Sequence, residues 1–182
     1  LANLGLIRFS GAEAQTFLHN QLTCDVAVLA PGKSTYGSYC TAKGRVLATF
    51  LLWRSGEDFF MQLPSPRREP IQKQLSKYIL RAKMKATDVS SDWVILGVAG
   101  RDSEGVVRRT VGAVPNAMHG VAQTPDAMAI KLPGDRYEIV AAREKAQAFL
   151  ESLSSGADKE GPDYWDWLDI RAGVPTILTA TQ

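Results

Sequence analysis

The chain has 182 residues, of which 45% are hydrophobic and 22% are charged. A chain of this length buries roughly two-thirds of the surface that its unfolded form exposes, which excludes a disordered segment and a disulfide-dependent mini-protein. The formal net charge of +2 comes from 21 Lys and Arg against 19 Asp and Glu. Bulk charge therefore does not indicate a protein dedicated to nucleic acid or to membrane surfaces.

The cysteines and histidines are too few and too scattered for a metal centre. Cys24 and Cys40 do not form a CxxC motif, and His19 and His119 lie far apart, so we predict no metal site. His19 and Cys24 could suggest a thiol–imidazole pair, but an exposed histidine and a buried cysteine explain the spacing better. No apolar run approaches the ~20 residues that cross a bilayer, and no signal peptide is visible. We therefore expect a cytoplasmic protein without a membrane segment.

Hydrophobic periodicity predicts the elements of the first half. The first helix buries Phe17 and Leu18, and Ser10 with Glu13 has the spacing of a capping box at its start. A later helix carries Tyr78 on its inner stripe. In chain order we predict a strand over Leu4–Phe9, the first helix, strands over Thr35–Cys40, Arg45–Arg54 and Phe59–Leu63, a helix over about Arg67–Leu80, and a strand over Lys83–Thr87.

The second half repeats this scheme more briefly. We predict a strand over Trp93–Ala99, a helix over Asp102–Arg109, a hairpin of Ala127–Leu132 and Arg136–Ala141, and helices over Arg143–Leu153 and about Asp163–Ala172. Each half follows a β-α-β-β-α plan, and the first half gains a closing strand. The sequence therefore predicts an α+β fold of two ferredoxin-like (split βαβ) modules with antiparallel sheets. We expect a first module over residues 1–90, a second over 91–157, and a helix with a tail over 158–182.

One basic run offers a possible contact with RNA. Its members are Arg67, Arg68, Lys73, Lys77, Arg81, Lys83 and Lys85, opposed only by Glu69. A cationic helix face can contact phosphates. Because Lys73, Lys77 and Arg81 recur every four residues opposite the apolar stripe, a solvated outer face explains them more simply. An RNA-binding module is therefore the weaker hypothesis.

The segment from Tyr36 to Arg45 combines aromatic and cationic side chains. Tyr36 and Tyr39 precede Lys43 and Arg45 around a turn. Aromatic walls with a few cations suit a flat heteroaromatic acid. An ordinary hairpin with surface tyrosines explains the pattern equally well, and no phosphate-binding, zinc-protease or serine-hydrolase motif is present.

Five segments carry a resemblance to a known family. They are Phe17–Val26, Tyr39–Val46, Leu75–Tyr78, Ile95–Gly100 and Leu168–Pro175. The first has the form F-L-x-x-Q-x-T-x-D-V, and the last reads L-D-I-R-A-G-V-P. In this order they resemble the YgfZ proteins, relatives of the glycine-cleavage T-protein, an aminomethyltransferase. The resemblance runs over essentially the whole chain.

The resemblance implies a folate-binding, T-protein-like fold. In that family two ferredoxin-like modules and a C-terminal β-barrel surround a channel for tetrahydrofolate or another reduced folate. It also implies a role in the assembly or repair of iron–sulfur clusters, with iron–sulfur enzymes or assembly factors as partners, and through them in tRNA modification. The family's K-G-C-x-x-G-Q-E motif and barrel lie downstream of the A-G-x-P segment. We therefore expect this chain to be the front part of a longer protein, with the C-terminal barrel absent from the chain.

Two departures from the aminomethyltransferases bear on the activity. Those enzymes carry an Asp pair where this chain has Ala48 and Thr49, and neither side chain can supply a carboxylate. Many relatives carry a Glu that contacts the pterin where this chain has Arg171. Either the pterin sits differently, or Arg171 meets a carboxylate of the folate. We expect an accessory protein rather than a classical aminomethyltransferase, with a folate-dependent C1 transferase as the alternative, and whether any reaction is catalysed stays open.

The resemblance also implies a set of folate contacts. A tyrosine near the pterin matches Tyr36, an apolar wall residue matches Leu63, and the turn at the channel mouth matches Lys43, Gly44 and Arg45. Thr49 and Arg171 complete the predicted folate-binding residues. No catalytic residue is assigned.

Overall fold

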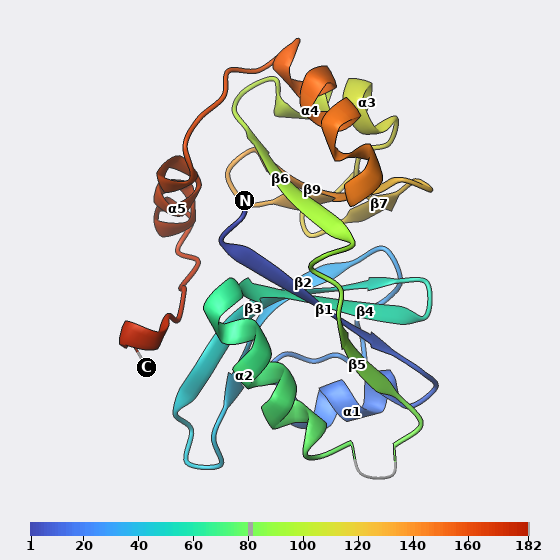
Figure 1. The fold of residues 1–182 in the computed structure, drawn as a ribbon, viewed down its shortest axis with the longest axis vertical. Helices are drawn as coiled ribbons and strands as arrows, with labels where there is room; N and C mark the ends of the chain where they lie inside the picture. Colours follow the sequence, from blue (N-terminus) through green and yellow to red (C-terminus); the bar gives the residue numbers. More distant parts are fainter. Residues whose placement is uncertain (80–81, 182) are drawn as a thin grey trace. The chain divides into compact units, whose positions relative to one another are not determined.

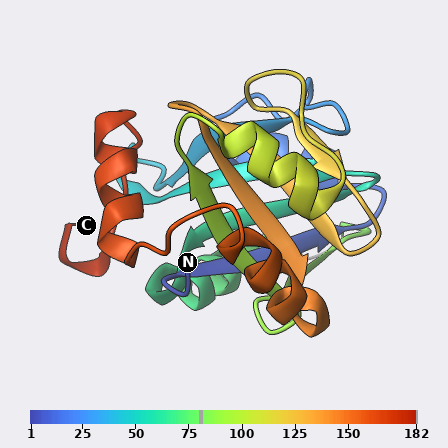
Figure 2. The same ribbon diagram turned by 90° about the horizontal axis from the view of Figure 1, so that it is seen from above.

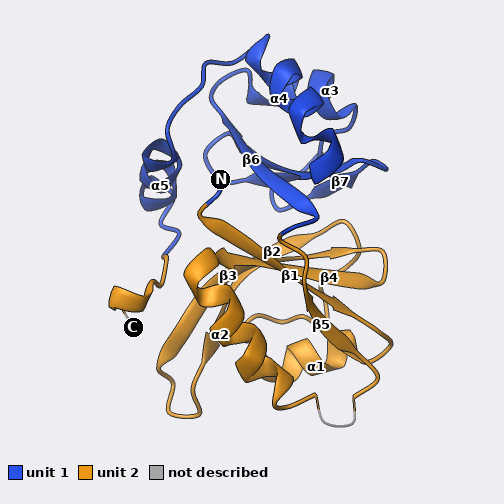
Figure 3. Ribbon diagram, in the orientation of Figure 1, with its two compact units in different colours: residues 1–2, 91–175 blue, residues 3–90, 176–182 orange. Residues whose placement is uncertain are grey.

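A computed structural model of the chain describes residues 1–79 and 82–181. The chain forms two compact units (Figure 3). Unit 1 comprises Leu1–Ala2 and Ser91–Pro175, and unit 2 comprises Asn3–Ser90 and Thr176–Gln182. The chain therefore enters each unit twice.

Unit 2 is built on a five-stranded sheet with the order β2-β3-β4-β1-β5, and every pairing is antiparallel (Figure 1). The strands are β1 (Leu4–Ser10), β2 (Ser34–Cys40), β3 (Val46–Ser55), β4 (Asp58–Pro64) and β5 (Lys85–Asp88). Because β4 lies between β1 and β3, the sheet has the split arrangement that the sequence predicts.

Helices α1 (Ala14–Gln21) and α2 (Ser65–Ser76) pack on one face of this sheet and form its core. Alternate strand residues such as Phe9, Phe50 and Met61 meet Leu18 and Ile71 there. We call the opposite side the second face of unit 2. Its side chains are also largely buried, and Trp53 and Phe60 stack there with ring centroids 5.6 Å apart.

Two local predictions for unit 2 are wrong. Helix α1 has no side-chain cap, because the carboxylate of Glu13 instead accepts a hydrogen bond from the backbone N–H of Lys83. Tyr78 is 54% exposed rather than inward, since the chain tightens after Ser76 into a turn in which the Tyr78 N–H donates to the carbonyl of Leu75. Leu80, the predicted end of this helix, lies outside the described residues.

Unit 1 repeats the two-layer design with a four-stranded antiparallel sheet, order β6-β9-β8-β7. Its elements are β6 (Trp93–Ala99), α3 (Ser103–Val111), β7 (Val121–Gln123), β8 (Ala127–Leu132), β9 (Arg136–Ala142), the 3-10 turn Arg143–Lys145 and α4 (Ala146–Ser154). Helices α3 and α4 cover one face, and α3 is seen lying over its sheet in Figure 2. Strand β7 is too short to have been predicted from periodicity. The predicted α+β fold with two antiparallel sheets is confirmed.

A last helix, α5 (Pro162–Arg171), belongs to unit 1 and is attached through Trp165 and Asp169. Trp165 packs over Gly97 of β6, where a Cβ atom would come within 2.5 Å of the indole ring. The buried guanidinium of Arg136 pairs with Asp169 at 2.7 Å and lies 5.0 Å from the ring centroid of Trp165. Among the described residues, no helix has both the length and the apolar character needed to cross a membrane.

Candidate functional site

Tyr36 and Thr49 lie on the second face of unit 2. Tyr36 of β2 stands opposite Leu51 of β3, and Ser38 stands opposite Thr49. Because opposed residues share a face and alternate residues point the same way, Tyr36 and Thr49 are diagonal neighbours, roughly 7–8 Å apart. The structure thus brings together two of the predicted folate contacts.

The hydroxyl of Thr49 holds the tail of the chain. The backbone N–H of Ile177 donates to Thr49 Oγ1 at 3.2 Å. This bond leaves the hydroxyl proton of Thr49 available for a second partner. The residues after Pro175, which include the 3-10 turn Thr179–Thr181, therefore belong to the surroundings of the site.

Two polar side chains on the same face were missed by the sequence analysis. Gln62 of β4 stands opposite Leu51 and Leu6, and Arg8 of β1 stands opposite Phe60. Gln62 is 6% exposed, and its Oε1 has no hydrogen-bond partner among the described residues. The Nε of Arg8 is likewise buried without one. A lone glutamine inside an apolar strand was the signal that could have found this position.

The turn between β2 and β3 presents two cations. Gly44 has a φ of 80°, which favours glycine, and the Arg45 N–H donates to Thr41 Oγ1 at 3.1 Å. Lys43 and Arg45 are exposed and make no ion pair within the described part of the chain. Their charges are therefore available to an anion.

Other predicted members of the site lie elsewhere. Leu63 is 1% exposed and belongs to the core, on the face of the sheet opposite to Thr49. Tyr39 also points into the core, where burial raises the pKa of its phenol. Tyr36 and Tyr39 are three residues apart and so cannot share a face of one strand. The pattern of aromatic and cationic residues from Tyr36 to Arg45 does not form one cluster.

Arg171 lies at the end of α5 in unit 1. Its guanidinium is 4.7 Å from the ring centroid of Trp167, four residues earlier on the same helix. Trp167 in turn stacks on Tyr164 with a centroid distance of 5.6 Å. The exposed guanidinium of Arg171 therefore contacts an aromatic ring of its own helix.

The basic run of α2 is not a uniform solvated face. Arg67 is buried and donates to the carbonyl of Leu47 at 2.6 Å through Nη2. Arg68 pairs with Asp88 at 2.8 Å, and Lys73 pairs with Glu69 at 2.5 Å. Arg81 lies outside the described residues. Fewer free cations therefore remain for phosphate than the sequence suggests.

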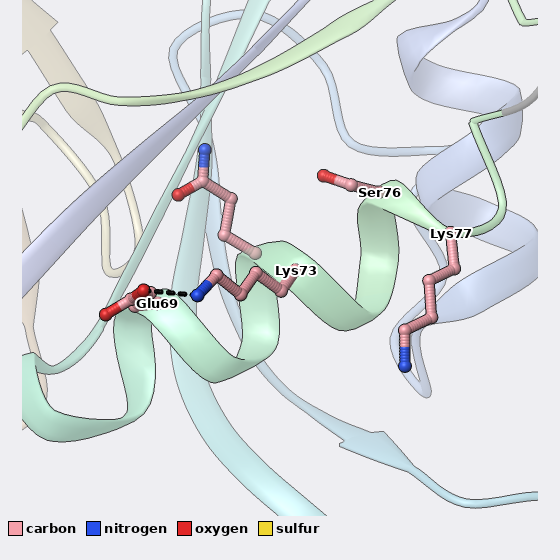
Figure 4. Close-up of a pocket in the computed structure, with 5 residues that line it drawn as sticks. Glu69, Lys73, Ser76 and Lys77 are labelled. Carbon is pink, nitrogen blue, oxygen red and sulfur yellow. Dashed lines mark ion pairs between the residues drawn. The ribbon is translucent and has the colours of Figure 1, made fainter.

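The exposed side of α2 forms a surface hollow lined by Glu69, Gln72, Lys73, Ser76 and Lys77 (Figure 4). The hydrogen bond and charge of Lys73 lower the pKa of Glu69. The ion pair between these two residues crosses the hollow and neutralises both charges. Lys77, which donates to the neutral amide oxygen of Gln74, is then the only charge of the lining that this ion pair does not neutralise.

The thiols and imidazoles form no reactive pair. His19 Nδ1 lies 3.2 Å from Asp25 Oδ1, and burial raises the pKa of Cys24, so that thiol stays protonated. Cys24 and Cys40 are both free thiols. Within the described ranges, no group of three or more His, Cys, Asp or Glu side chains is placed to hold a metal ion.

Residues 1–161 match the family described as the GCVT N-terminal domain. The chain belongs to this family. The match spans both sheets and ends just before α5. The five sequence segments predicted a YgfZ-like relative of the glycine-cleavage T-protein, and that resemblance is confirmed.

Relatives of this GCVT N-terminal domain include two bacterial proteins named tRNA-modifying protein YgfZ. The Yersinia enterocolitica protein is 32% identical over 185 residues, covering 98% of this chain and 54% of the relative. The Sodalis glossinidius protein is 30% identical over 183 residues, covering 99% of this chain and 55% of the relative. The chain therefore spans about half the length of these relatives.

Solved structures agree on the fold of the GCVT N-terminal domain. The glycine cleavage system aminomethyltransferase T from Bartonella henselae aligns with a TM-score of 0.75 at 21% identity, over 84% of this chain and 43% of that one. A chain of the heterotetrameric sarcosine oxidase from Corynebacterium sp. U-96 aligns with a TM-score of 0.61 at 12% identity, over 88% and 85% of the two chains. At these identities the likeness concerns the fold alone.

Proposed function

We propose that the natural protein carrying this chain binds tetrahydrofolate or another reduced folate and supports the assembly or repair of iron–sulfur clusters, and through them tRNA modification. The observation that carries the proposal is the neutral character of the strand position at which T-proteins use a carboxylate. Ala48 is buried in the core, and Thr49 presents only a hydroxyl. The YgfZ relatives are named tRNA-modifying proteins, which supports the link to tRNA modification.

The side chains of unit 2 fit the chemistry of a folate. A pterin ring presents N–H donors, and the unpaired Oε1 of Gln62 can accept from such a group. Tyr36 offers an aromatic ring, and Thr49 a hydroxyl that can still donate. Lys43 and Arg45 would meet the carboxylates of the folate's glutamate tail.

A bound reduced folate would supply one-carbon chemistry, and the residues named here would bind and orient it. The hydroxyl of Thr49 cannot take up a proton at neutral pH as a carboxylate at that position could. Leu63 stays a predicted contact, and from the core side it could act only by supporting the strand. A cytoplasmic location belongs to the same proposal.

Titration calorimetry of the natural protein with tetrahydrofolate tests the binding. We expect saturable heat, and Arg45→Ala should weaken the affinity by at least about tenfold, because one charge-assisted hydrogen bond contributes about 1.5–3 kcal/mol. Tyr36→Phe, which keeps the ring, should weaken binding less than Tyr36→Ala. Arg101→Ala, an exposed change in unit 1, serves as the matched control. The absence of heat with any reduced folate would contradict the proposal.

A folate-dependent C1 transferase is the second candidate, since the fold is shared with an aminomethyltransferase. The neutral Thr49 argues against it. We expect no turnover of aminomethyl donors with tetrahydrofolate, and turnover by the natural protein would favour the transferase. The RNA-binding reading loses support from the intramolecular bonds of Arg67, Arg68 and Lys73.

A further inference from the structure

Thr49 carries a hydroxyl whose proton has no acceptor among the described residues. Its oxygen accepts the backbone N–H of Ile177 at 3.2 Å, and its side chain is partly exposed on the second face of unit 2. A hydroxyl that accepts one hydrogen bond becomes a better donor, because hydrogen bonds in a chain polarise one another. Thr49 is therefore oriented as a donor, whereas a carboxylate at the same position only accepts.

Three kinds of polar group follow one another from the middle of β3 to the turn that precedes it. Gln62 of β4 stands opposite Leu51 of β3 and offers an unpaired amide oxygen. Thr49 lies two residues before Leu51, which makes it a diagonal neighbour of Gln62 at roughly 7–8 Å. The turn before β3 carries the cations of Lys43 and Arg45. In the direction of the turn, unit 2 thus presents an acceptor, then a donor, then positive charge.

An extended reduced folate carries its groups in a matching order. The pyrimidine ring of the pterin has N–H donors at one end, and the glutamate carboxylates lie at the other end. Between them lie N5 and N10, the two nitrogens that carry one-carbon groups. When the pterin donates to Gln62 and the glutamate meets the turn, the region of N5 and N10 faces Thr49. A group on one of these nitrogens then meets the proton of the Thr49 hydroxyl.

One-carbon groups differ in whether they can accept that proton. A formyl group presents a carbonyl oxygen, which is a good acceptor, whereas a methyl group presents only carbon and hydrogen. Unsubstituted tetrahydrofolate presents N–H groups, which leave the Thr49 proton without a good partner. We propose that Thr49 makes the site selective for reduced folates that carry a formyl group on N5 or N10. This inference rests on the proposed binding of a reduced folate, and it adds which one-carbon form is bound.

Titration calorimetry of the natural protein with four folates tests the selectivity. The ligands are tetrahydrofolate and its 5-methyl, 5-formyl and 10-formyl forms. The 5-methyl form is the matched control, because it fills the same position as the 5-formyl group without an acceptor. We expect one formyl form to bind about tenfold more tightly than the methyl and unsubstituted forms, since one hydrogen bond is gained. The two formyl ligands distinguish whether N5 or N10 faces Thr49.

Variants of Thr49 separate hydrogen bonding from shape. Thr49→Val has nearly the same shape without a hydroxyl and should abolish the preference for a formyl form, whereas Thr49→Ser should retain it. Thr49→Asp replaces the donor with an acceptor and should reverse the preference in favour of unsubstituted tetrahydrofolate. The affinity of Thr49→Val for the 5-methyl form should stay unchanged, which also shows that this variant is folded.

The outcomes distinguish this inference from the proposed function. Equal binding of all four folates, or a formyl preference that survives Thr49→Val, would overturn the selectivity and leave folate binding in place. Tighter binding of unsubstituted tetrahydrofolate than of both formyl forms would overturn it as well. If none of the four folates binds, the proposed function fails, and the inference fails with it.

Discussion

Among the described residues, each unit buries one arginine, and the two units satisfy its hydrogen-bonding groups in different ways. In unit 2, Arg67 of α2 is 6% exposed and donates to the backbone carbonyl of Leu47 in β3. In unit 1, Arg136 of β9 is 1% exposed, donates to the carbonyl of Pro133, and pairs with Asp169 of α5. Both arginines attach a helix to a strand, but only the second depends on another ionisable group.

This difference bears on how stable the attachment of each helix is. A carbonyl acceptor belongs to the sheet and is present whenever the strand is formed. A carboxylate from a helix must be brought in and desolvated, and one nitrogen of the pair, Arg136 Nη2, stays without a hydrogen-bond partner among the described residues. The attachment of α5 is therefore the more easily broken of the two, and the changes below are ordered by expected effect.

Replacing Arg136 should cause the largest loss. Arg136→Met leaves Asp169 without its cation and removes the contact with Trp165, and we expect a cost of about 3 kcal/mol in the free energy of unfolding. Chemical denaturation of the natural protein measures it. The double change Arg136→Met with Asp169→Leu should recover part of the loss. A double variant no more stable than Arg136→Met would contradict the importance of the unpaired carboxylate.

Replacing Arg67 should cost less. Arg67→Met leaves the Leu47 carbonyl without its side-chain donor, and we expect a loss of about 2 kcal/mol, within the range for an unsatisfied buried group. The same denaturation experiment applies. If Arg67→Met destabilises the protein more than Arg136→Met does, the contrast between the neutral and the ionic attachment fails.

Adding a side chain at Gly97 tests the apolar contact between Trp165 of α5 and strand β6. Gly97→Ala places a Cβ atom 2.5 Å from the Trp165 ring, and we expect overpacking to cost about 1–2 kcal/mol. Because the three atoms nearest to this Cβ all belong to Trp165, Gly97→Ala should cost much less in a Trp165→Leu background. If the losses of stability from Gly97→Ala and Trp165→Leu simply add in the double variant, the Trp165 ring does not pack against Gly97.

The smallest expected effect is a pH dependence of the unfolding free energy that comes from the α5 attachment and not from the α2 attachment. Burial raises the pKa of Asp169, and the hydrogen bond and charge of Arg136 only partly oppose this. The folded protein then holds the proton more tightly than the unfolded chain, so stability should fall slightly as pH rises through the interval that begins at the ordinary value of 3.8. Asp169→Asn should remove this dependence from the curve of unfolding free energy against pH. Arg67→Met should keep it, because Arg67 has a neutral partner.

Much of the fold could be predicted because the signals are local. The apolar run Trp93–Ala99 coincides with β6, and the spacing of Ala14, Phe17 and Leu18 identified the buried side of α1. Strand β7 and the shortened α2 were missed, since three residues carry no period and the end of a helix depends on its neighbours.

The candidate site was less predictable. Family motifs identified Tyr36 and Thr49, which are diagonal neighbours on one face. They also identified Leu63, which points into the core of unit 2. Its neighbour Gln62 points to the second face, where Tyr36 and Thr49 lie. A one-residue step along a strand reverses the face, and a motif match alone does not resolve that step.

The sequence by itself determined the α+β class, the family and most element positions, because periodicity and motifs depend on residues close together in the chain. Only the tertiary structure decided that Arg67 is a buried donor, that Thr49 holds Ile177, and that Gly97 accommodates Trp165. These contacts join residues 20 to 128 positions apart. Which of many possible distant partners a side chain meets is set by packing the whole unit, because each contact must be compatible with all the others.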